Sequence, residues 1–185
     1  MSKTALIPVA DGTEEMEAVT IIDVLRRAGV NVTVASVEAD LEITASRGVR
    51  IVADMSVSEC VGATYDLIVL PGGMPGAEHL RDSKDLLKIL TRQHQEDRLC
   101  GAICAAPAVV LHHHGFLQGR RATAHPGFME RLDAEQARED RVVIDGLLVT
   151  SRGPGTALEF ALQLVALLYD DRKASAVAEP MVVKE

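Results

Sequence analysis

The chain has 185 residues, of which 48% are hydrophobic, and a formal net charge of −8 at pH 7. This composition can bury a sizeable core without disulfides or metals, and we interpret residues 1–185 as one domain. The acidic charge disfavours nucleic acid as a partner, except as a chemically modified substrate, because phosphate binding needs concentrated positive charge. No signal-peptide pattern and no run of roughly 18 uncharged residues is present, so we expect a soluble cytoplasmic protein with no membrane partner.

The first predicted elements are a strand, a helix and a second strand. The apolar run at 4–10 predicts a buried strand, and Asp-Gly-Thr at 11–13 predicts the turn that begins a helix. The apolar positions of that helix recur with helical spacing at Ala18, Ile21, Ile22, Leu25 and Ala28. Gly29 supplies a stop, and residues 30–36 predict the next strand.

The middle of the chain departs from this alternation and then returns to it. Residues 41–57 show short alternating pieces, which suggest a hairpin off the main sheet. An apolar strand is predicted over 66–70, ending in Pro-Gly-Gly at 71–73, and a polar helix over 83–97.

The last third predicts more strands and helices of the same kind. We expect a strand over 99–103, a helix over 105–114 and a short strand over 121–124. Asp145-Gly146 predicts a hairpin between two strands, and a long amphipathic helix begins near residue 158. The whole pattern predicts an α/β fold, a mainly parallel doubly wound sheet with helices on both faces.

Cys104 lies where an apolar strand gives way to a helix, between small residues that permit a sharp turn. A helix N-terminus stabilises a thiolate, so we predict a lowered pKa and a reactive sulfur. The alternative is a buried small hydrophobe. Cys100, inside the apolar run, is interpreted as that buried kind and Cys60 as structural. Three cysteines without zinc-type spacing predict neither a disulfide framework nor a metal site.

Several polar features follow neighbouring strands and should meet Cys104 at the carboxyl edge of the sheet. Gly72 and Gly73 could direct a backbone N–H at the sulfur together with the amide of Ala105, although a tight turn is the alternative. His125 could orient or protonate a leaving group, or simply occupy a turn. One right-handed crossover would bring it beside Cys104.

The acidic stretch at 14–17 has two interpretations. It could compensate the dipole of the first helix. Alternatively, one protonated carboxyl could donate a hydrogen bond to the thiolate, because an ionised neighbour would repel it. Helical periodicity leaves both Glu14 and Glu17 as candidates.

Two further motifs are interpreted as structural. Three consecutive histidines at 112–114 cannot face one ion on a regular helix, which disfavours metal binding. The run Ser-Arg-Gly-Pro-Gly-Thr at 151–156 favours a helix cap over an anion nest.

Four ordered motifs resemble the ThiJ/PfpI superfamily, in particular the branch of the parkinsonism-associated protein deglycase and the bacterial chaperone YajL. They are Gly-Thr-Glu-Glu-Met-Glu at 12–17, Leu-Pro-Gly-Gly at 70–73, Ala-Ile-Cys-Ala-Ala-Pro at 102–107 and Thr-Ser-Arg-Gly-Pro-Gly-Thr at 150–156. The resemblance covers essentially the whole chain, including the ending at 178–185. It implies a flavodoxin-like homodimer without a cofactor or metal.

The resemblance also implies the roles of individual residues. It assigns the nucleophile to Cys104, the protonated carboxyl to Glu17 and a further proton-handling group to His125. Backbone donors fall at Gly73 and Ala105. Arg27 and Arg47 match positions that shape an anionic pocket near the dimer interface.

The implied activity is cysteine-dependent deglycase or glyoxalase chemistry on methylglyoxal or glyoxal adducts of proteins and on the free dicarbonyls, with protection against oxidative stress. The alternative is a redox-sensing chaperone in which Cys104 is oxidised to a sulfinate. Proteolytic members carry a histidine directly after the cysteine, where this chain has Ala105, so a protease is disfavoured.

Overall fold

The structure, a computed structural model, describes residues 2–183. Residue 1 and residues 184–185, which belong to the predicted domain 1–185 and, at the C-terminus, to the segment of resemblance at 178–185, lie outside the described residues. The interpretation of the chain as a single domain stays a prediction.

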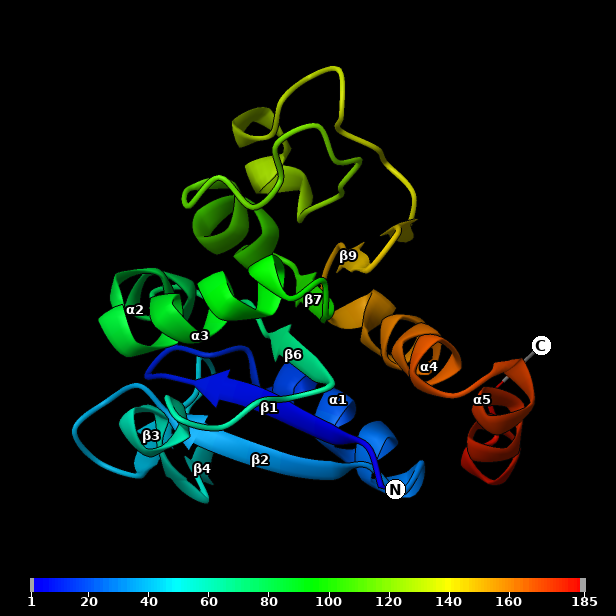
Figure 1. The fold of residues 1–185 in the computed structure, drawn as a ribbon, viewed down its shortest axis with the longest axis horizontal. Coiled ribbons are helices and arrows are strands. Elements are labelled where there is room, and N and C mark those ends of the chain that lie inside the picture. The colour runs from blue at the N-terminus through cyan, green and yellow to red at the C-terminus, as the bar shows by residue number, and fades with distance from the viewer. Residues whose placement is uncertain (1, 184–185) are drawn as a thin grey trace.

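Seven strands form one sheet in the order β5-β2-β1-β6-β7-β9-β8 (Figure 1). They are β1 (Thr4–Val9), β2 (Asn31–Ser36), β5 (Met55–Ser56), β6 (Leu67–Leu70), β7 (Leu99–Ile103), β8 (Val142–Asp145) and β9 (Leu148–Ser151). Every neighbouring pair is parallel except β8 and β9, the predicted Asp-Gly hairpin. The predicted α/β fold with a mainly parallel sheet is confirmed.

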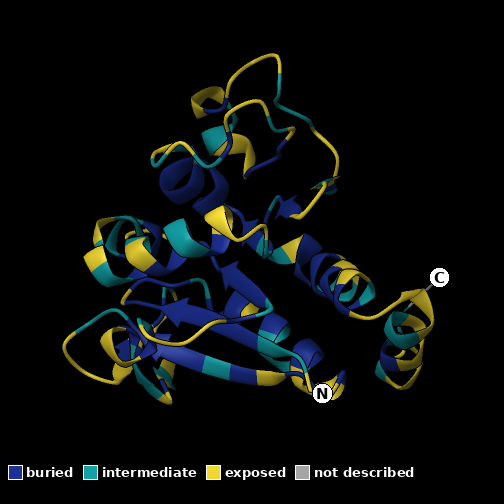
Figure 2. Cartoon of the chain, viewed as in Figure 1, coloured by how far each residue is buried: buried dark blue, intermediate teal, exposed yellow. Residues whose placement is uncertain are grey.

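Helices cover both faces of this sheet, each over its own apolar cluster. One face carries α1 (Glu15–Arg27) and α4 (Ala157–Leu168), which pack on each other, and α5 (Asp171–Ala178) packs on α4. The other carries α2 (Gly76–Asp82), α3 (Lys84–Gln95) and the π-helix η2 (Pro107–His112). Figure 2 shows the central strands as buried, whereas exposed residues are frequent on the outer helices and loops. The predicted flavodoxin-like layering is therefore present.

The predicted excursion between residues 41 and 57 is confirmed for its hairpin, but its last part, β5, joins the main sheet as an edge strand parallel to β2. The strands β3 (Glu42–Thr44) and β4 (Arg50–Val52) form a separate antiparallel sheet. The short 3-10 segments of the chain are η1 (Val57–Cys60), η3 (Pro126–Arg131), η4 (Pro154–Thr156) and η5 (Glu179–Met181).

Several details differ from the prediction. The helix α2 forms before residue 83, where no helix was expected, and the helix expected over 105–114 is the π-helix η2. No strand forms over 121–124; the chain there makes one isolated bridge, between Ala122 and Ala137. Its backbone N–H groups bond to acceptors outside the sheet ladder, as at Thr123, whose N–H donates to Thr150 Oγ1 over 2.9 Å. The helix α5 was not predicted, because Val177 is its one buried residue and gives no apolar stripe.

Within residues 2–183, no helix combines the length and the apolar character that crossing a lipid bilayer would require.

Candidate active site around Cys104

Cys104 follows β7 directly and has a left-handed backbone conformation, with φ of 64°. Such a conformation is strained for a residue with a side chain and is common at functional sites. Two hydrogen bonds fix it: the Cys104 N–H donates to Ser151 O over 3.0 Å, and the Cys104 carbonyl accepts from the His125 N–H over 2.8 Å. The turn places the thiol at the carboxyl edge of the sheet, with the residue 9% exposed.

The turn at Gly72 and Gly73 packs directly against Cys104, as the sequence predicts. A Cβ added at Gly72 would lie 2.6 Å from Cys104 Cβ, and Gly73 has φ of 89°. Neither position therefore accommodates a side chain without a shift. The backbone N–H groups of Gly73 and Ala105 both donate to the Cys104 sulfur and favour its ionised form. These are the two donors that the sequence singled out.

The three glutamates at the start of α1 have three different partners. Glu14 is the N-cap, and its Oε2 accepts from the Glu17 N–H over 2.8 Å. Glu15 accepts from Ser46 Oγ and from the Arg47 N–H, so it holds the β3–β4 hairpin against the helix. Glu17 is fully buried and contacts Cys104. The choice that periodicity left open is therefore made by packing, in favour of Glu17.

Burial dominates the electrostatics of Glu17. Its Oε2 accepts the Gly72 N–H over 2.8 Å. Among the described residues, Oε1 finds no hydrogen-bond partner of good geometry, although the carboxyl also interacts with the Cys104 thiol. Desolvation raises the pKa of Glu17 to about 7, against the opposing hydrogen bonds from Gly72 and Cys104. A carboxyl with this pKa holds a proton in a large share of molecules near neutral pH.

The expectation of a lowered pKa at Cys104 is wrong for the site as a whole. Burial, followed by the charge and hydrogen bond of Glu17, raises the pKa of the Cys104 thiol to about 12, despite the lowering effect of the Gly73 and Ala105 amides. The N–H groups at the start of the helix do lower the pKa, but desolvation and the Glu17 carboxyl outweigh them. Both opposing influences come from the tertiary fold.

The two groups nevertheless titrate together. A charge on Glu17 raises the pKa of Cys104, so the pair releases one proton near pH 7 and keeps the second to far higher pH. The singly charged pair has one proton, which either Glu17 or Cys104 can hold. The amides of Gly73 and Ala105 stabilise the form with the charge on sulfur, and the Gly72 amide stabilises the carboxylate.

His125 reaches the site by a different route from the one predicted. It does not end a strand, but its backbone N–H donates to the Cys104 carbonyl. Its exposed ring lies beside Gly153, where a Cβ would be 3.6 Å from His125 Cδ2. Nδ1 accepts from the Gly127 N–H over 3.1 Å, so the neutral ring carries its proton on Nε2. Cys104 and His125 are therefore neighbours, as predicted. The predicted reason, a crossover between two strands, is wrong because His125 does not follow a strand.

The two predicted arginines are not both near Cys104. Arg47 lies at the hairpin turn, where its N–H reaches Glu15. Arg27 lies ten residues after Glu17 on α1, about 15 Å along the helix axis, and pairs with Asp23 over 2.6 Å. Within one chain, Arg27 therefore does not line the Cys104 site. Its place near a dimer interface stays a prediction.

The remaining cysteines are buried or partly buried away from the site. Burial alone raises the pKa of Cys100 to about 12, and Cys100 lines a small cavity of about 40 Å³ at the opposite end of β7, between α3 and the β8–β9 turn. Burial also raises the pKa of Cys60. The interpretation of both as structural agrees with these surroundings.

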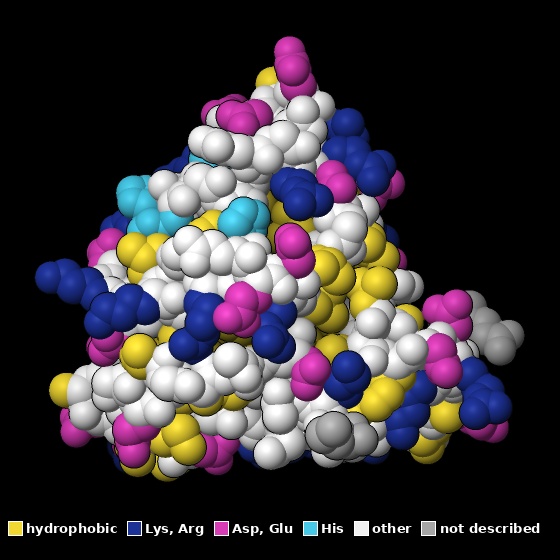
Figure 3. All heavy atoms as spheres, viewed as in Figure 1, with side chains coloured by type: hydrophobic (Ala, Val, Ile, Leu, Met, Phe, Trp, Pro, Cys, Tyr) yellow, Lys and Arg dark blue, Asp and Glu magenta, His cyan; other side chains and the backbone are white. Residues whose placement is uncertain are grey.

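The motifs interpreted as structural have internal partners. Thr156 Oγ1 accepts from the N–H groups of Arg152 and Gly153, which makes the run at 151–156 a cap. His112 lies 3.4 Å from Asp133, whereas His114 lies 2.9 Å from Arg81 O, so neighbouring histidines face different partners. Figure 3 shows histidine side chains gathered on one part of the displayed face.

Sequence reasoning missed the groups that anchor the His125 segment. Thr150 Oγ1 and Met129 Sδ accept backbone N–H groups there. Thr150 begins the motif at 150–156, but nothing in that motif indicates this contact, and no motif includes Met129. The available signal was the lack of any regular periodicity after residue 124, which indicates a segment that needs side-chain partners.

A cysteine on a strained strand-to-helix turn, beside a buried glutamate at the edge of a doubly wound sheet, defines an α/β protein with a nucleophile-type site. Residues 3–167 match the model of the DJ-1/PfpI family, and the chain belongs to that family.

The similar proteins include DJ-1 homologues from several organisms. The chain is 48% identical to protein DJ-1 homolog A of Arabidopsis thaliana, over 99% of this chain and 47% of the relative, so it spans about half the length of that protein. It is 41% identical to protein dj-1beta of Drosophila melanogaster, over 99% of this chain and 98% of the relative. Oxidized DJ-1 of Toxoplasma gondii superimposes with a TM-score of 0.98 at 47% identity, covering 100% of both chains.

One relative has a name that states an activity. The glutathione-independent glyoxalase DJR-1.2 of Caenorhabditis elegans is 34% identical over 97% of this chain and 95% of its own length.

Proposed function

We propose that this protein is a cysteine-dependent glyoxalase that also acts as a deglycase on methylglyoxal or glyoxal adducts of proteins. The observation that carries the proposal is the contact between the buried carboxyl of Glu17 and the thiol of Cys104, with two backbone N–H donors at the sulfur. The glyoxalase relative at 34% identity supports the reaction class. Protein adducts extend this class, because they hold the same aldehyde-derived carbon.

The first step is the attack of the Cys104 sulfur, while Glu17 holds the proton of the Glu17–Cys104 pair. Cys104 attacks the aldehyde carbon of methylglyoxal as a thiolate, and the carbonyl becomes an alkoxide that takes a proton to give a hemithioacetal. The amides of Gly73 and Ala105, which point at the sulfur, lie beside the carbon bonded to it and would stabilise the developing oxyanion. Glu17 stays protonated during attack, so no second negative charge opposes the thiolate.

The second stage moves a proton between two carbons. A base removes the proton from the former aldehyde carbon, and a proton is returned to the neighbouring carbon; this gives a thioester that water hydrolyses to lactate. Glu17, which contacts the Cys104 thiol, and His125, whose backbone N–H bonds to the Cys104 carbonyl, are the groups that we propose handle these protons. In the deglycase reaction, the bond from the aldehyde-derived carbon to the amine, guanidine or thiol of the modified protein breaks as the Cys104 sulfur bonds to that carbon, and the leaving nitrogen or sulfur takes up a proton.

Lactate release tests the proposal. Wild type, Cys104→Ser and Cys100→Ser would be incubated with free methylglyoxal and, separately, with methylglyoxal-modified albumin freed of unbound dicarbonyl. We expect both reactions to fall at least a hundred-fold in Cys104→Ser and to change less than two-fold in Cys100→Ser. Equal lactate release from wild type and Cys104→Ser would overturn the proposal. Turnover of the free dicarbonyl alone would restrict it to glyoxalase.

A redox-sensing role is the second candidate, and the same site supports it. Two equivalents of peroxide would convert the Cys104 thiolate to a sulfinate with release of two waters, and the amides of Gly73 and Ala105 would hold its oxygens. The similarity to a DJ-1 structure described as oxidized favours this candidate. Mass spectrometry after mild peroxide should show two oxygens gained on Cys104. If Cys104→Ala keeps any chaperone activity, that activity does not depend on this thiol.

We further propose that the chain forms a homodimer through the outer face of α1 and the β3–β4 hairpin. Met16 and Val19 of α1 are 60% and 50% exposed, and Val49 and Val52 of the hairpin are 49% and 66% exposed. Exposed apolar side chains gathered on adjoining elements are typical of interfaces. Arg27 follows Met16 and Val19 along this side of α1 at helical spacing, so a partner could bring it into contact. Val52→Asp should shift the sedimentation coefficient to that of a monomer.

A further inference from the structure

The segment 122–125, which carries His125, has no strand neighbour, yet each of its backbone N–H groups has an acceptor. Ala122 N–H donates to Gln136 O over 3.1 Å, and His125 N–H donates to Cys104 O. The two N–H groups between them have side-chain acceptors, Thr150 Oγ1 at 2.9 Å and Met129 Sδ at 3.3 Å. Buried backbone donors must be paired, so these side chains replace the missing strand.

We propose that Met129 is a positioning residue for His125, through the hydrogen bond that its thioether accepts from the Ala124 N–H. Ala124 is fully buried and directly precedes His125. Met129 belongs to η3, the 3-10 helix that begins at Pro126 with His125 as its N-cap. The bond closes a loop of six residues, 124–129, and so fixes both ends of the stretch that presents the imidazole. Its consequence for catalysis rests on the proposed function.

The acceptor of this bond is the thioether sulfur, so the bond can be removed without removing the bulk of the side chain. A thioether is a weak acceptor, and methionine usually fills apolar space. Here Met129 is only partly buried, and the Thr123 hydroxyl also lies 4.0 Å from its Sδ. Leucine would fill the same volume with little loss of packing but would leave the Ala124 N–H without an acceptor. Met129→Leu therefore separates the hydrogen bond from the packing.

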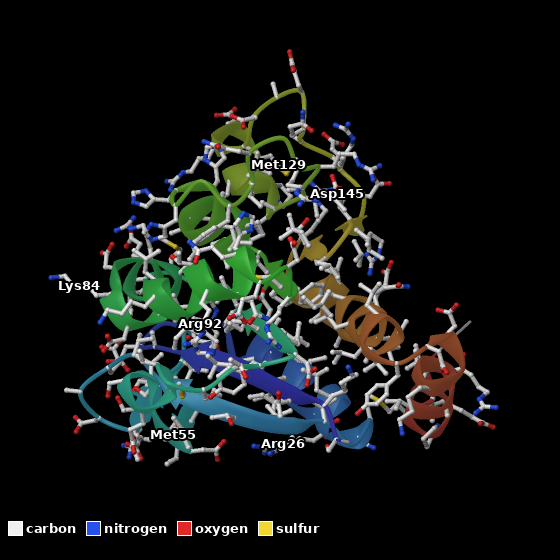
Figure 4. All side chains as sticks on the ribbon, viewed as in Figure 1. Arg26, Met55, Lys84, Arg92, Met129 and Asp145 are labelled. Atoms are coloured by element: carbon white, nitrogen blue, oxygen red, sulfur yellow. The ribbon has the colours of Figure 1, made fainter. Side chains whose placement is uncertain are left out.

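Met55 offers a matched control. It is a partly buried methionine on the edge strand β5, and Figure 4 shows Met129 and Met55 at opposite ends of the molecule. Thr150 supplies a second pair of variants. Thr150→Val removes the acceptor of the Thr123 N–H, whereas Thr150→Ser keeps it.

Amide exchange and histidine NMR test the proposal directly. In Met129→Leu we expect the Ala124 amide to exchange about ten-fold faster, since an unpaired buried donor is costly. The His125 ring signals, assigned by their loss in His125→Gln, should shift or broaden. Met55→Leu should leave both unchanged. Thr150→Val should speed the exchange of the Thr123 amide, and Thr150→Ser should not.

The kinetic readout is a split between kcat and KM. A displaced His125 should lower kcat for methylglyoxal about five- to ten-fold in Met129→Leu, with KM changed less than about two-fold. An unchanged Ala124 amide and unchanged His125 signals in Met129→Leu would overturn the proposal, as would equal changes in Met55→Leu. If wild type shows no glyoxalase turnover, the proposed function is overturned instead. The NMR and amide-exchange results would then still test whether Met129 positions His125.

Discussion

The two ends of β7 carry the same side chain in different settings. Cys100 lies near the start of the strand, where burial is the one influence on its thiol and raises the pKa to about 12. Cys104 follows the end of the strand, and the pKa of its thiol is also raised to about 12, but by burial together with Glu17 and against two N–H donors. The two thiols therefore have the same raised pKa for different physical reasons.

The difference lies in where a proton can go. Burial is the one cause of the raised pKa at Cys100, with no contribution from a carboxyl of the described residues, so its ionisation requires a desolvated thiolate. Cys104 instead contacts Glu17, whose pKa of about 7 lets the carboxyl give or take a proton near neutral pH. A parallel sheet produces this asymmetry, because loops and helix N-termini meet at the carboxyl ends of its strands.

The largest expected effect is the contrast in reactivity between the two thiols. At pH 7.5 Cys104 should be alkylated by iodoacetamide about a thousand-fold faster than Cys100, because only Cys104 reaches the thiolate form through the pair. Peptide mass spectrometry would follow both residues in one sample. The rate at Cys104 should rise with an inflection near pH 7. Comparable alkylation rates at Cys104 and Cys100, or an inflection of the Cys104 rate near pH 12, would contradict the expected difference between the two thiols.

The next effect concerns stability. The raised pKa of Glu17 means that this carboxyl binds its proton more tightly in the folded state than in the unfolded state, where its pKa is 4.5. Its contribution to stability is therefore full below pH 4.5 and is lost as pH rises towards about 7. Between pH 5 and 8 the free energy of unfolding of wild type should fall by about 2 to 3 kcal/mol relative to Glu17→Gln. Urea denaturation at both pH values measures this, and parallel curves would contradict it.

A smaller effect is expected from crowding the turn beside Cys104. Gly72→Ala would place a Cβ 2.6 Å from Cys104 Cβ, so we expect a loss of about 2 kcal/mol in unfolding free energy and slower alkylation of Cys104. Gly155→Ala is the control, because a Cβ there meets nothing within 4 Å. Thermal and urea unfolding would compare the two. Similar stability losses would show that the Gly72 contact is not special.

The finest test asks which atom carries the charge of the pair. If sulfur carries it in wild type, Glu17→Gln replaces a strong donor by a weaker one, and alkylation of Cys104 at pH 6.5 should slow about ten-fold. If the carboxylate carries it, the same substitution removes a repelling charge and should speed alkylation. The sign of the change therefore decides between the two forms.

Much of the fold followed from local pattern. Apolar runs, helical spacing and Gly or Asp turns predicted the strands β1, β2, β6 and β7, the helices α1, α3 and α4 and the Asp145-Gly146 hairpin, because those signals reside within a few neighbouring residues. They did not predict β5, the short edge strand. The predicted strand at 121–124 was wrong, since two of its N–H groups donate to side chains, of Thr150 and Met129, and not to a neighbouring strand. Side-chain acceptors of this kind leave no periodic trace.

By itself, the sequence determined that Cys104 ends a buried strand before a helix, and that glycines and acidic residues follow neighbouring strands. Only the tertiary structure decided that Glu17 rather than Glu14 meets the sulfur, that Arg27 lies far along α1 and that the thiol is desolvated. The reason is physical. Connectivity and turn geometry are local properties, whereas a pKa depends on every group and every excluded water around the atom that ionises.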